Sequence, residues 1–430
     1  MRIVHIAPGA GDSFYCENCL RDAALFRALM RQGHDVVAVP LYLPLQSDTE
    51  EEWAGGPIFF GGINVYLQQK LGLFRRTPRW LDSLFDRPGL LRWVGRRASM
   101  TRAKDLGETT ISMLKGREGR QVKELNRLLD WLESQGDRPD LVCLSNLLLA
   151  GLVNGLKERL GVPVVSLLQD EDSFLDSLVE PYREQAWQLT CERAEDIDGF
   201  VSVSRYYAEA MRERLGVGSE RMHVVYPGIE LDSYGSAAGE PEVPTIGYLS
   251  RVCSDKGLDV LVEAFTKLKR ERQLRQLRLW VAGGMTMGDK AFMAGIKRRI
   301  ASGGVGGYVD FFDGFDRATK LEFFRGVSVL CVPERKPIAF ALYVLESLAA
   351  GVPVAEPAHG VFGELLEVTG GGVLFERVGS EEIAGAVRPL LLDSGLCRRL
   401  GAEGRQVVFD RFGVEQTAGE MLRIFEKVAC

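Results

Sequence analysis

Residues 331–367 constrain the fold of this chain more than any other stretch. They read CVPERKPIAFALYVLESLAAGVPVAEPAHGVFGELLE. An apolar run ends at Pro333 and a polar loop follows it. We then predict a helix over 340–350, which Gly351 ends, and a short buried strand at 352–354, because that segment is apolar and β-branched. The order strand, loop, helix, strand is that of a parallel α/β sheet.

The start of the predicted helix is the first candidate for a ligand site. In parallel α/β sheets, ligands bind at the carboxyl ends of the strands, where helix amino-terminal ends present amide groups and a positive dipole end to anions. Residues 340–344 form that helix end, and Glu346 lies within its first two turns. The pattern therefore predicts an anion site here.

Length and composition bound the remaining possibilities. A chain of 430 residues suits two domains, each able to bury a core. The net charge of -6 gives no overall attraction to nucleic acid or anionic lipid. The chain opens on a strand pattern without a secretion signal, and no apolar run approaches the roughly 20 residues that cross a bilayer. The eight cysteines lie mostly in apolar stretches, so we expect a cytoplasmic protein.

The amino-terminal segment has the pattern strand, glycine-containing loop, helix, strand. The strands are expected at 3–7 and 36–40, and the loop contains Gly9 and Gly11. A dinucleotide site is rejected, because the third glycine of its motif falls on Phe14 and no acidic residue closes the second strand. Two interpretations stay open: the loop admits a phosphate or an acceptor to the backbone, or it is a tight turn without a ligand.

Two other features of the first half carry weaker signals. Cys16 and Cys19 form a single C-x-x-C with no second cysteine pair or histidine cluster, so no metal site is expected. Residues 71–104 are basic and interleaved with aromatics. That segment is either a peripheral membrane or anionic-acceptor surface or, as we favour, a solvated helical insert with an aromatic inner face.

Polar residues follow two further predicted strands, at 139–144 and 162–168. Ser145 and Asn146 follow the first, and the acidic loop 169–172, which contains Asp170 and Glu171, follows the second. Carboxylates at this edge either bind acceptor hydroxyls or serve the next helix, with Asp172 as its amino-terminal cap.

The second half restarts the α/β pattern after a linker-like segment at 235–244. A strand at its start leads to Arg251 and Lys256, and an amphipathic helix follows Gly257. A guanidinium can bind two phosphate oxygens at once, and an ammonium supplies a mobile point charge. Two cations at a strand end therefore predict a phosphate site.

Together these motifs resemble the GT-B-fold glycosyltransferases of family four, the retaining group 1 enzymes. Their donor motif is Glu, seven residues, Glu, then Ala-Gly-x-Pro-Val; Glu346 and residues 349–354 match it. Arg251 and Lys256, followed by Gly-x-Asp-x-Leu-x-x-Ala-Phe, match the pair that clamps the donor diphosphate. The first Glu of the motif is Ile338 here, and Glu334 lies on the wrong side of the loop to replace it.

The resemblance implies an α/β fold of two Rossmann-like domains facing across a cleft. Residues 1–225 would form the acceptor domain and 226–414 the nucleotide-sugar donor domain. The last helix, within 415–430, would cross back to the first domain.

The resemblance also implies transfer of a sugar from a nucleotide diphosphate to a glycan, lipid or small-molecule acceptor. The anomeric configuration would be retained, without a metal or cofactor. Arg251 and Lys256 would stabilise the leaving diphosphate. The implied donor-binding residues are Gly283, Gly314, Phe315, Phe340, Ala341, Leu342, Tyr343 and Glu346, and those on the acceptor side are Asn146, Asp170 and Glu171.

A second hypothesis is a degenerate member that binds a nucleotide sugar, a glycan or a partner without turnover. It rests on Ile338, on the Ala339 and Ala341 changes beside it, and on Ser145 and Asn146 where family members often carry a histidine.

Overall fold

The structure is a computed structural model. It describes residues 1–8, 17–42, 59–60, 103–235, 237, 239, 241–312 and 317–430, apart from the side chains of residues 17, 19, 20, 103–105 and 287. Over these residues the chain divides into two compact units, one of Met1–Tyr226 with Thr417–Cys430 and one of Pro227–Gln416. No helix in the described part of the chain is long and apolar enough to cross a membrane.

The first unit is built around a parallel sheet of order β2-β1-β3-β4-β5-β6 within the described residues. Its strands are β1 (Arg2–Ala7), β2 (Asp35–Pro40), β3 (Leu141–Leu144), β4 (Val164–Leu168), β5 (Gly199–Ser202) and β6 (Met222–Val224). Its helices are α1 (Glu17–Arg31), α5 (Ala103–Leu114), α6 (Val122–Ser134), α7 (Val153–Leu160), α8 (Glu171–Ser177), α9 (Tyr182–Ala194), α10 (Arg205–Leu215) and α18 (Val414–Ala429).

The second unit repeats this plan with a parallel sheet of order β12-β11-β10-β7-β8-β9, again counted over the residues that the structure describes. Its strands are β7 (Thr245–Leu249), β8 (Arg278–Ala282), β9 (Val309–Phe312), β10 (Val329–Leu330), β11 (Val354–Pro357) and β12 (Gly372–Phe375). Its helices are α11 (Leu258–Leu268), α12 (Lys290–Ser302), α13 (Arg317–Arg325), α14 (Leu342–Ala349), α15 (Phe362–Thr369), α16 (Ser380–Leu392) and α17 (Ser394–Arg411).

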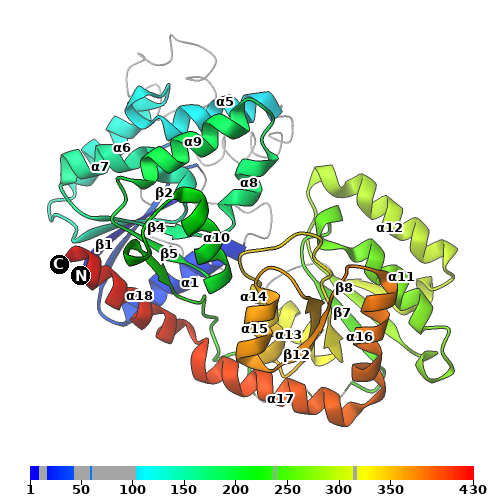
Figure 1. Cartoon of the computed structure of the whole chain (residues 1–430). Coiled ribbons are helices and arrows are strands. Elements are labelled where there is room, and N and C mark those ends of the chain that lie inside the picture. Colours follow the sequence, from blue (N-terminus) through cyan, green and yellow to red (C-terminus); the bar gives the residue numbers. More distant parts are fainter. Residues whose placement is uncertain are drawn as a thin grey trace. The chain divides into compact units, whose positions relative to one another are not determined.

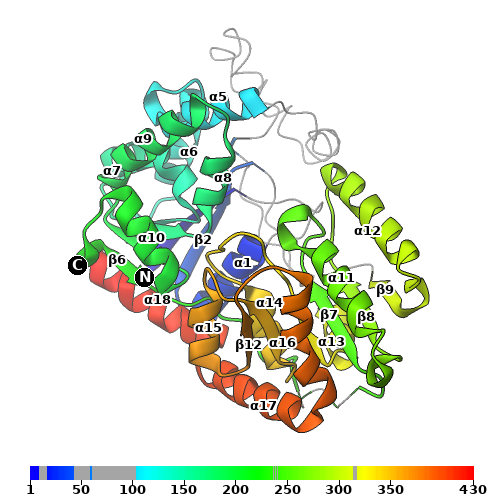
Figure 2. The same ribbon diagram turned by 45° about the vertical axis from the view of Figure 1, so that its right-hand side comes forward.

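Helices cover both faces of each sheet, as Figures 1 and 2 show. The central strands β3, β4, β5 and β7 are accordingly buried at every residue, and their sequences are mostly apolar. The last helix, α18, belongs to the first unit from Thr417 onward. There Thr417 donates a hydrogen bond to the Tyr226 carbonyl at 3.1 Å, and a Cβ added to Gly199 of β5 would contact Val428. The expected return of the chain to its first domain is therefore confirmed.

Each sheet has one point where the order of its strands reverses. In the first sheet the chain moves outward from β1 to β2 and then returns to β3; in the second it runs β7, β8, β9 and returns to β10. Loops at such points diverge at the carboxyl edge of the sheet and leave room for a ligand. These points are therefore the first places to look for sites.

Two local predictions around α14 were displaced by a few residues. The helix begins at Leu342 rather than 340, and the following strand is Val354–Pro357 rather than 352–354. Val352 does not join the strand because its amide donates to the Ser347 carbonyl at 2.9 Å, which closes the end of the helix.

Candidate functional site

The reversal point of the second sheet lies between β7 and β10, which pair directly through Ile246 with Val329 and Gly247 with Leu330. The loop after β7 carries Arg251 and Lys256, and the loop after β10 leads into α14. The topology therefore places the phosphate-binding candidates and the helix of Glu346 on two neighbouring loops at the carboxyl edge.

Arg251 lies just past the end of β7 with about half of its side chain exposed, 51%. Its backbone carbonyl accepts hydrogen bonds from the Tyr248 hydroxyl and from the Cys253 amide, both at 3.0 Å. The Nε atom is 3.9 Å from Asp289, a long ion pair. A fixed backbone with an exposed guanidinium is an arrangement suited to an anionic ligand.

Lys256 ends the 3₁₀ turn η7 (Ser254–Lys256), and Gly257 follows it with a φ of 67°. A Cβ on Gly257 would lie 2.1 Å from the Pro333 carbonyl, so the two loops touch at a position that only glycine can occupy. The Lys256 ammonium forms an ion pair with Glu334 at 2.5 Å.

Glu334 is the residue that sequence reasoning set aside and that the structure brings into the site. Its side chain is only 2% exposed, whereas that of Lys256 is 25% exposed. The signal that could have found it was topological: the polar loop after β10 leaves the sheet beside the loop after β7. Predicting that β7 and β10 are neighbours requires the strand order, which short-range patterns do not give.

Glu346 lies in α14 and is 7% exposed. Its Oε1 forms an ion pair with the ammonium of Lys320 from α13, which is 8% exposed. A carboxylate and an ammonium buried together compensate each other's lost hydration. Lys320 was not predicted, because a lysine in a short helix is most often exposed.

The other predicted donor-binding residues divide by exposure. Ala341, Leu342 and Tyr343 are buried at the start of α14, and Phe340 is half-buried. No side chain caps the helix at Ala341.

Gly283 follows β8 with a φ of 148°, a conformation that L-residues rarely adopt. A Cβ there would lie 1.8 Å from the Ser250 carbonyl, so the glycine permits the loop after β8 to approach the loop of Arg251. Gly314 and Phe315 lie outside the described residues.

The carboxyl edge of the first sheet was also predicted to carry site residues. Of the residues named there, Gly9, Gly11 and Cys16 lie outside the described residues, and the side chain of Cys19 is not described. Asn146 caps the 3₁₀ helix η5 (Leu147–Leu152) by accepting a hydrogen bond from the Leu148 amide at 3.1 Å.

Glu171 is 3% exposed, and protein groups surround its carboxyl. The amides of Leu147 and Gln169 donate to it at 3.1 and 2.7 Å, and the Tyr207 hydroxyl lies 3.0 Å from its Oε2. Burial raises the pKa of Glu171 to about 7, although these hydrogen bonds lower it. The Tyr207 hydroxyl also lies 2.9 Å from Asp172, so a protonated Glu171 can donate to Tyr207 while Tyr207 donates to Asp172.

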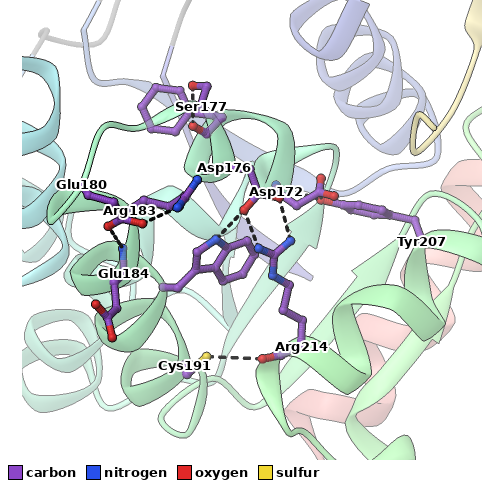
Figure 3. Close-up of polar contacts among 11 residues, drawn as sticks. Asp172, Asp176, Ser177, Glu180, Arg183, Glu184, Cys191, Tyr207 and Arg214 are labelled. Atoms are coloured by element: carbon purple, nitrogen blue, oxygen red, sulfur yellow. Dashed lines mark hydrogen bonds and ion pairs between the residues drawn. The ribbon is translucent and has the colours of Figure 1, made fainter. Parts of the chain in front are cut away.

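The prediction that Asp172 caps the next helix is wrong. Helix α8 begins at Glu171, its cap position is Asp170 with a φ of 79°, and Asp170 makes no side-chain cap. Asp172 lies one residue inside the helix and faces Tyr207 of α10 (Figure 3). The carboxylate therefore joins two helices rather than ending one.

A second cluster joins α8, α9 and the end of α10 at the surface. The Arg214 guanidinium donates to Asp176 at 2.9 Å and lies 3.6 Å from the centre of the Trp187 ring, whose Nε1 also donates to Asp176 at 2.9 Å (Figure 3). These contacts connect the three helices.

Within the described residues, no group of three or more His, Cys, Asp or Glu side chains is arranged to hold a metal ion. The basic segment 71–104 lies outside the described residues, except for the backbone of 103 and 104.

Comparison with known proteins agrees with this architecture. The family model described as "Glycosyl transferases group 1" matches residues 236–407, and the model described as "Glycosyltransferase Family 4" matches residues 97–233. Among solved structures, the sucrose-phosphate synthase of Thermosynechococcus elongatus has a TM-score of 0.71 and 18% identity, covering 100% of this chain and 99% of that one. HepE of Anabaena, solved in complex with UDP, has a TM-score of 0.69 and 14% identity, covering 99% and 100%.

Curated relatives align over shorter stretches. The D-inositol 3-phosphate glycosyltransferase of Jonesia denitrificans is 27% identical over 221 residues, which cover 48% of this chain and 52% of the relative. The phosphatidyl-myo-inositol mannosyltransferase of Mycobacterium leprae is 28% identical over 240 residues, covering 55% and 60%. The chain thus spans little more than half the length of the curated relatives it matches.

Two parallel six-stranded sheets in the described residues, each flanked by helices, define an α/β protein of the GT-B class. The two family models lie one on each half of the chain. The protein belongs to the group 1 glycosyltransferases of family 4.

Proposed function

We propose that this protein transfers a sugar from a nucleotide diphosphate to an acceptor hydroxyl. The observation that carries the proposal is the placement of Arg251 and Lys256 on the loop at the reversal point of the second sheet, where ligands bind in open α/β sheets. HepE, whose fold this chain shares, is described in complex with UDP and with UDP-glucose. That description supports a nucleotide sugar as the donor.

In the proposed reaction the bond between the anomeric carbon and the diphosphate oxygen breaks, and a bond to the acceptor oxygen forms on the same face of the sugar. The proton of the acceptor hydroxyl passes to the leaving diphosphate oxygen. Negative charge grows on the diphosphate as it leaves. Arg251 and Lys256 stabilise that charge, together with the backbone amides of the first turn of α14. These protein cations supply the positive charge that other transferases take from a metal ion, so we expect activity to persist in a chelator.

The acceptor is proposed only by class. The names of the two curated relatives described above contain inositol 3-phosphate and phosphatidyl-myo-inositol, and a polyol with a phosphate group is therefore the first acceptor to test. Glu346 would accept hydrogen bonds from the donor ribose, with Lys320 holding its other side. The cysteine pattern makes the cytoplasm the expected compartment.

A second candidate function is nucleotide-sugar binding without turnover. One observation favours it: the first motif carboxylate is the half-buried Ile338, so a charged hydrogen bond to the donor sugar is missing. Such a bond contributes roughly 1.5 to 3 kcal/mol.

Both candidates are tested by incubating the purified protein with a panel of nucleotide sugars, with and without inositol phosphate, and measuring release of the nucleoside diphosphate. Release that disappears in Arg251→Ala and in Lys256→Ala supports transfer. Lys267→Ala is the matched control, because Lys267 forms an exposed ion pair with Glu381 elsewhere in the same unit. Thermal stabilisation by nucleotide without any release supports the binding protein instead. If the panel gives neither release nor stabilisation, both functions are contradicted.

A further inference from the structure

The ion pair of Lys256 and Glu334 is unequal in exposure, and this inequality decides which partner can move. The carboxylate is 2% exposed and the ammonium 25% exposed, at a separation of 2.5 Å. A buried carboxylate that loses its cation remains charged in a medium that solvates it poorly. The structure therefore holds Lys256 beside Glu334, a partner that the sequence did not indicate.

The backbone around Glu334 is also fixed. The Glu334 amide donates to the Val332 carbonyl at 2.7 Å, and its carbonyl lies 3.1 Å from His359 Nε2. The next residue, Arg335, donates from its amide to the Asp255 carbonyl at 2.8 Å and from its guanidinium to Asp259 at 2.8 Å. The loop after β10 is thus tied to the loop after β7, which keeps the Glu334 backbone next to Lys256.

This fixed carboxylate changes the charge that a diphosphate meets. Arg251 and Lys256 together would present two positive charges, but Glu334 cancels one of them at contact distance. The site is therefore less attractive to an anion than its two cations alone indicate.

We propose that Glu334 is a built-in counter-charge of the donor site, which positions the Lys256 ammonium and weakens the binding of the nucleoside diphosphate product. This inference rests on the proposed function. Its consequence is faster product release, since a diphosphate carries two or more negative charges and leaves a neutralised pair more readily than a free cation.

The test is titration calorimetry of the full chain with UDP and with GDP. Glu334→Gln keeps the shape of the side chain and one accepting oxygen and removes its charge, so we expect the dissociation constant to fall about tenfold. Because Glu334 then no longer offsets the charge of Lys256, binding by the variant also becomes more sensitive to salt than binding by the wild type. Glu334→Asp, which keeps the charge, should stay within about threefold of the wild type. Glu381→Gln, at an exposed ion pair of the same unit, should leave affinity unchanged.

Each outcome decides the proposal. If the wild type binds a nucleoside diphosphate but folded Glu334→Gln binds it equally or more weakly, the counter-charge role is overturned and the donor site stands. If neither protein binds any nucleoside diphosphate, the proposed function falls together with this inference. If Glu334→Gln does not fold, the wild type alone still tests the idea. Its affinity should change by less than about threefold between roughly 50 and 300 mM salt, and a steep dependence would contradict a neutralised pair.

Discussion

The carboxyl edges of the two sheets use their charged residues differently. At the edge of the first sheet, Glu171 is surrounded by backbone amides and a tyrosine hydroxyl, and Asn146 caps a turn. At the edge of the second, the carboxylates of Glu334 and Glu346 are paired with ammonium groups. Similar topologies thus support two kinds of polar edge: one that orders the backbone, and one that holds cations where an anion would bind.

The difference teaches that strand-end position alone does not identify a binding residue. Asp170 and Glu171 follow a strand as directly as Arg251 does. Glu171 is nevertheless enclosed, whereas half of the Arg251 side chain is exposed. Exposure at a strand end, with the backbone already satisfied, is what separates a candidate ligand-binding side chain from a structural one.

The largest effect is expected at the buried ion pair of the second unit. Lys320→Met leaves the Glu346 carboxylate buried without its cation, and we expect a loss of about 3–5 kcal/mol in the free energy of unfolding. Denaturant titration measures it. The double variant Lys320→Met with Glu346→Leu should recover most of the loss, because it removes the stranded charge. A loss below about 1 kcal/mol in the single variant would show that the pair is not buried as described.

The next effect is a pH dependence in the first unit. The pKa of Glu171 is about 7 in the folded protein, above its ordinary value, so the folded state holds a proton that the unfolded state releases near pH 4.5. The stabilisation that this proton gives the folded state is fully present below about pH 4.5 and is lost as the pH rises through 7. The loss amounts to about 3 kcal/mol at most.

Glu171→Gln should remove this pH dependence of the free energy of unfolding. The Gln side chain cannot ionise, although it loses one hydrogen bond to a backbone amide and lowers stability at pH 5. The stability gap between wild type and variant should therefore narrow from pH 5 to pH 8, measured by denaturant titration at each pH. Glu192 is an exposed glutamate of the same unit, and the free energy of unfolding of Glu192→Gln should depend on pH as that of the wild type does. A gap that widens with pH would contradict a raised pKa.

The sequence predicted the two sheets but not the partners of the site residues. The alternation of short apolar strands with helices predicted both sheets, because each strand of a parallel sheet is buried on two faces and must be apolar. The spacing of Arg251 and Lys256 also predicted that both residues lie on the same loop. The partners of these site residues did not, since Lys256 meets Glu334 and Glu346 meets Lys320 across 78 and 26 residues of chain. Such contacts depend on strand order and helix packing, which a local pattern does not contain.

A smaller effect is expected from restoring the missing motif carboxylate. Ile338→Glu should raise turnover by roughly 10- to 100-fold if the donor pocket has only lost a charged hydrogen bond to the sugar. Ile338→Gln is the matched control for size and polarity and should gain less. The measurement is the rate of nucleoside diphosphate release with the best donor of the panel. An unchanged or lower rate in Ile338→Glu would indicate a pocket rebuilt around an apolar side chain.

The smallest effect is expected at the surface cluster of the first unit. Arg214→Ala removes the stacking on Trp187 and the ion pair with Asp176, and should lower the free energy of unfolding by about 1 kcal/mol. Arg212→Ala, which removes an exposed pair with Glu209 on the same helix, should cost less than about 0.5 kcal/mol. Equal losses in both variants would mean that the stacking contributes nothing.

The most direct test of the account is a crystal of the full chain soaked with a nucleoside diphosphate. We predict that the diphosphate will lie at the reversal point of the second sheet, with oxygens within hydrogen-bonding distance of the Arg251 guanidinium and the Lys256 ammonium, and with Lys256 still paired to Glu334. A diphosphate bound at the edge of the first sheet, or bound without contact to either cation, would contradict the account.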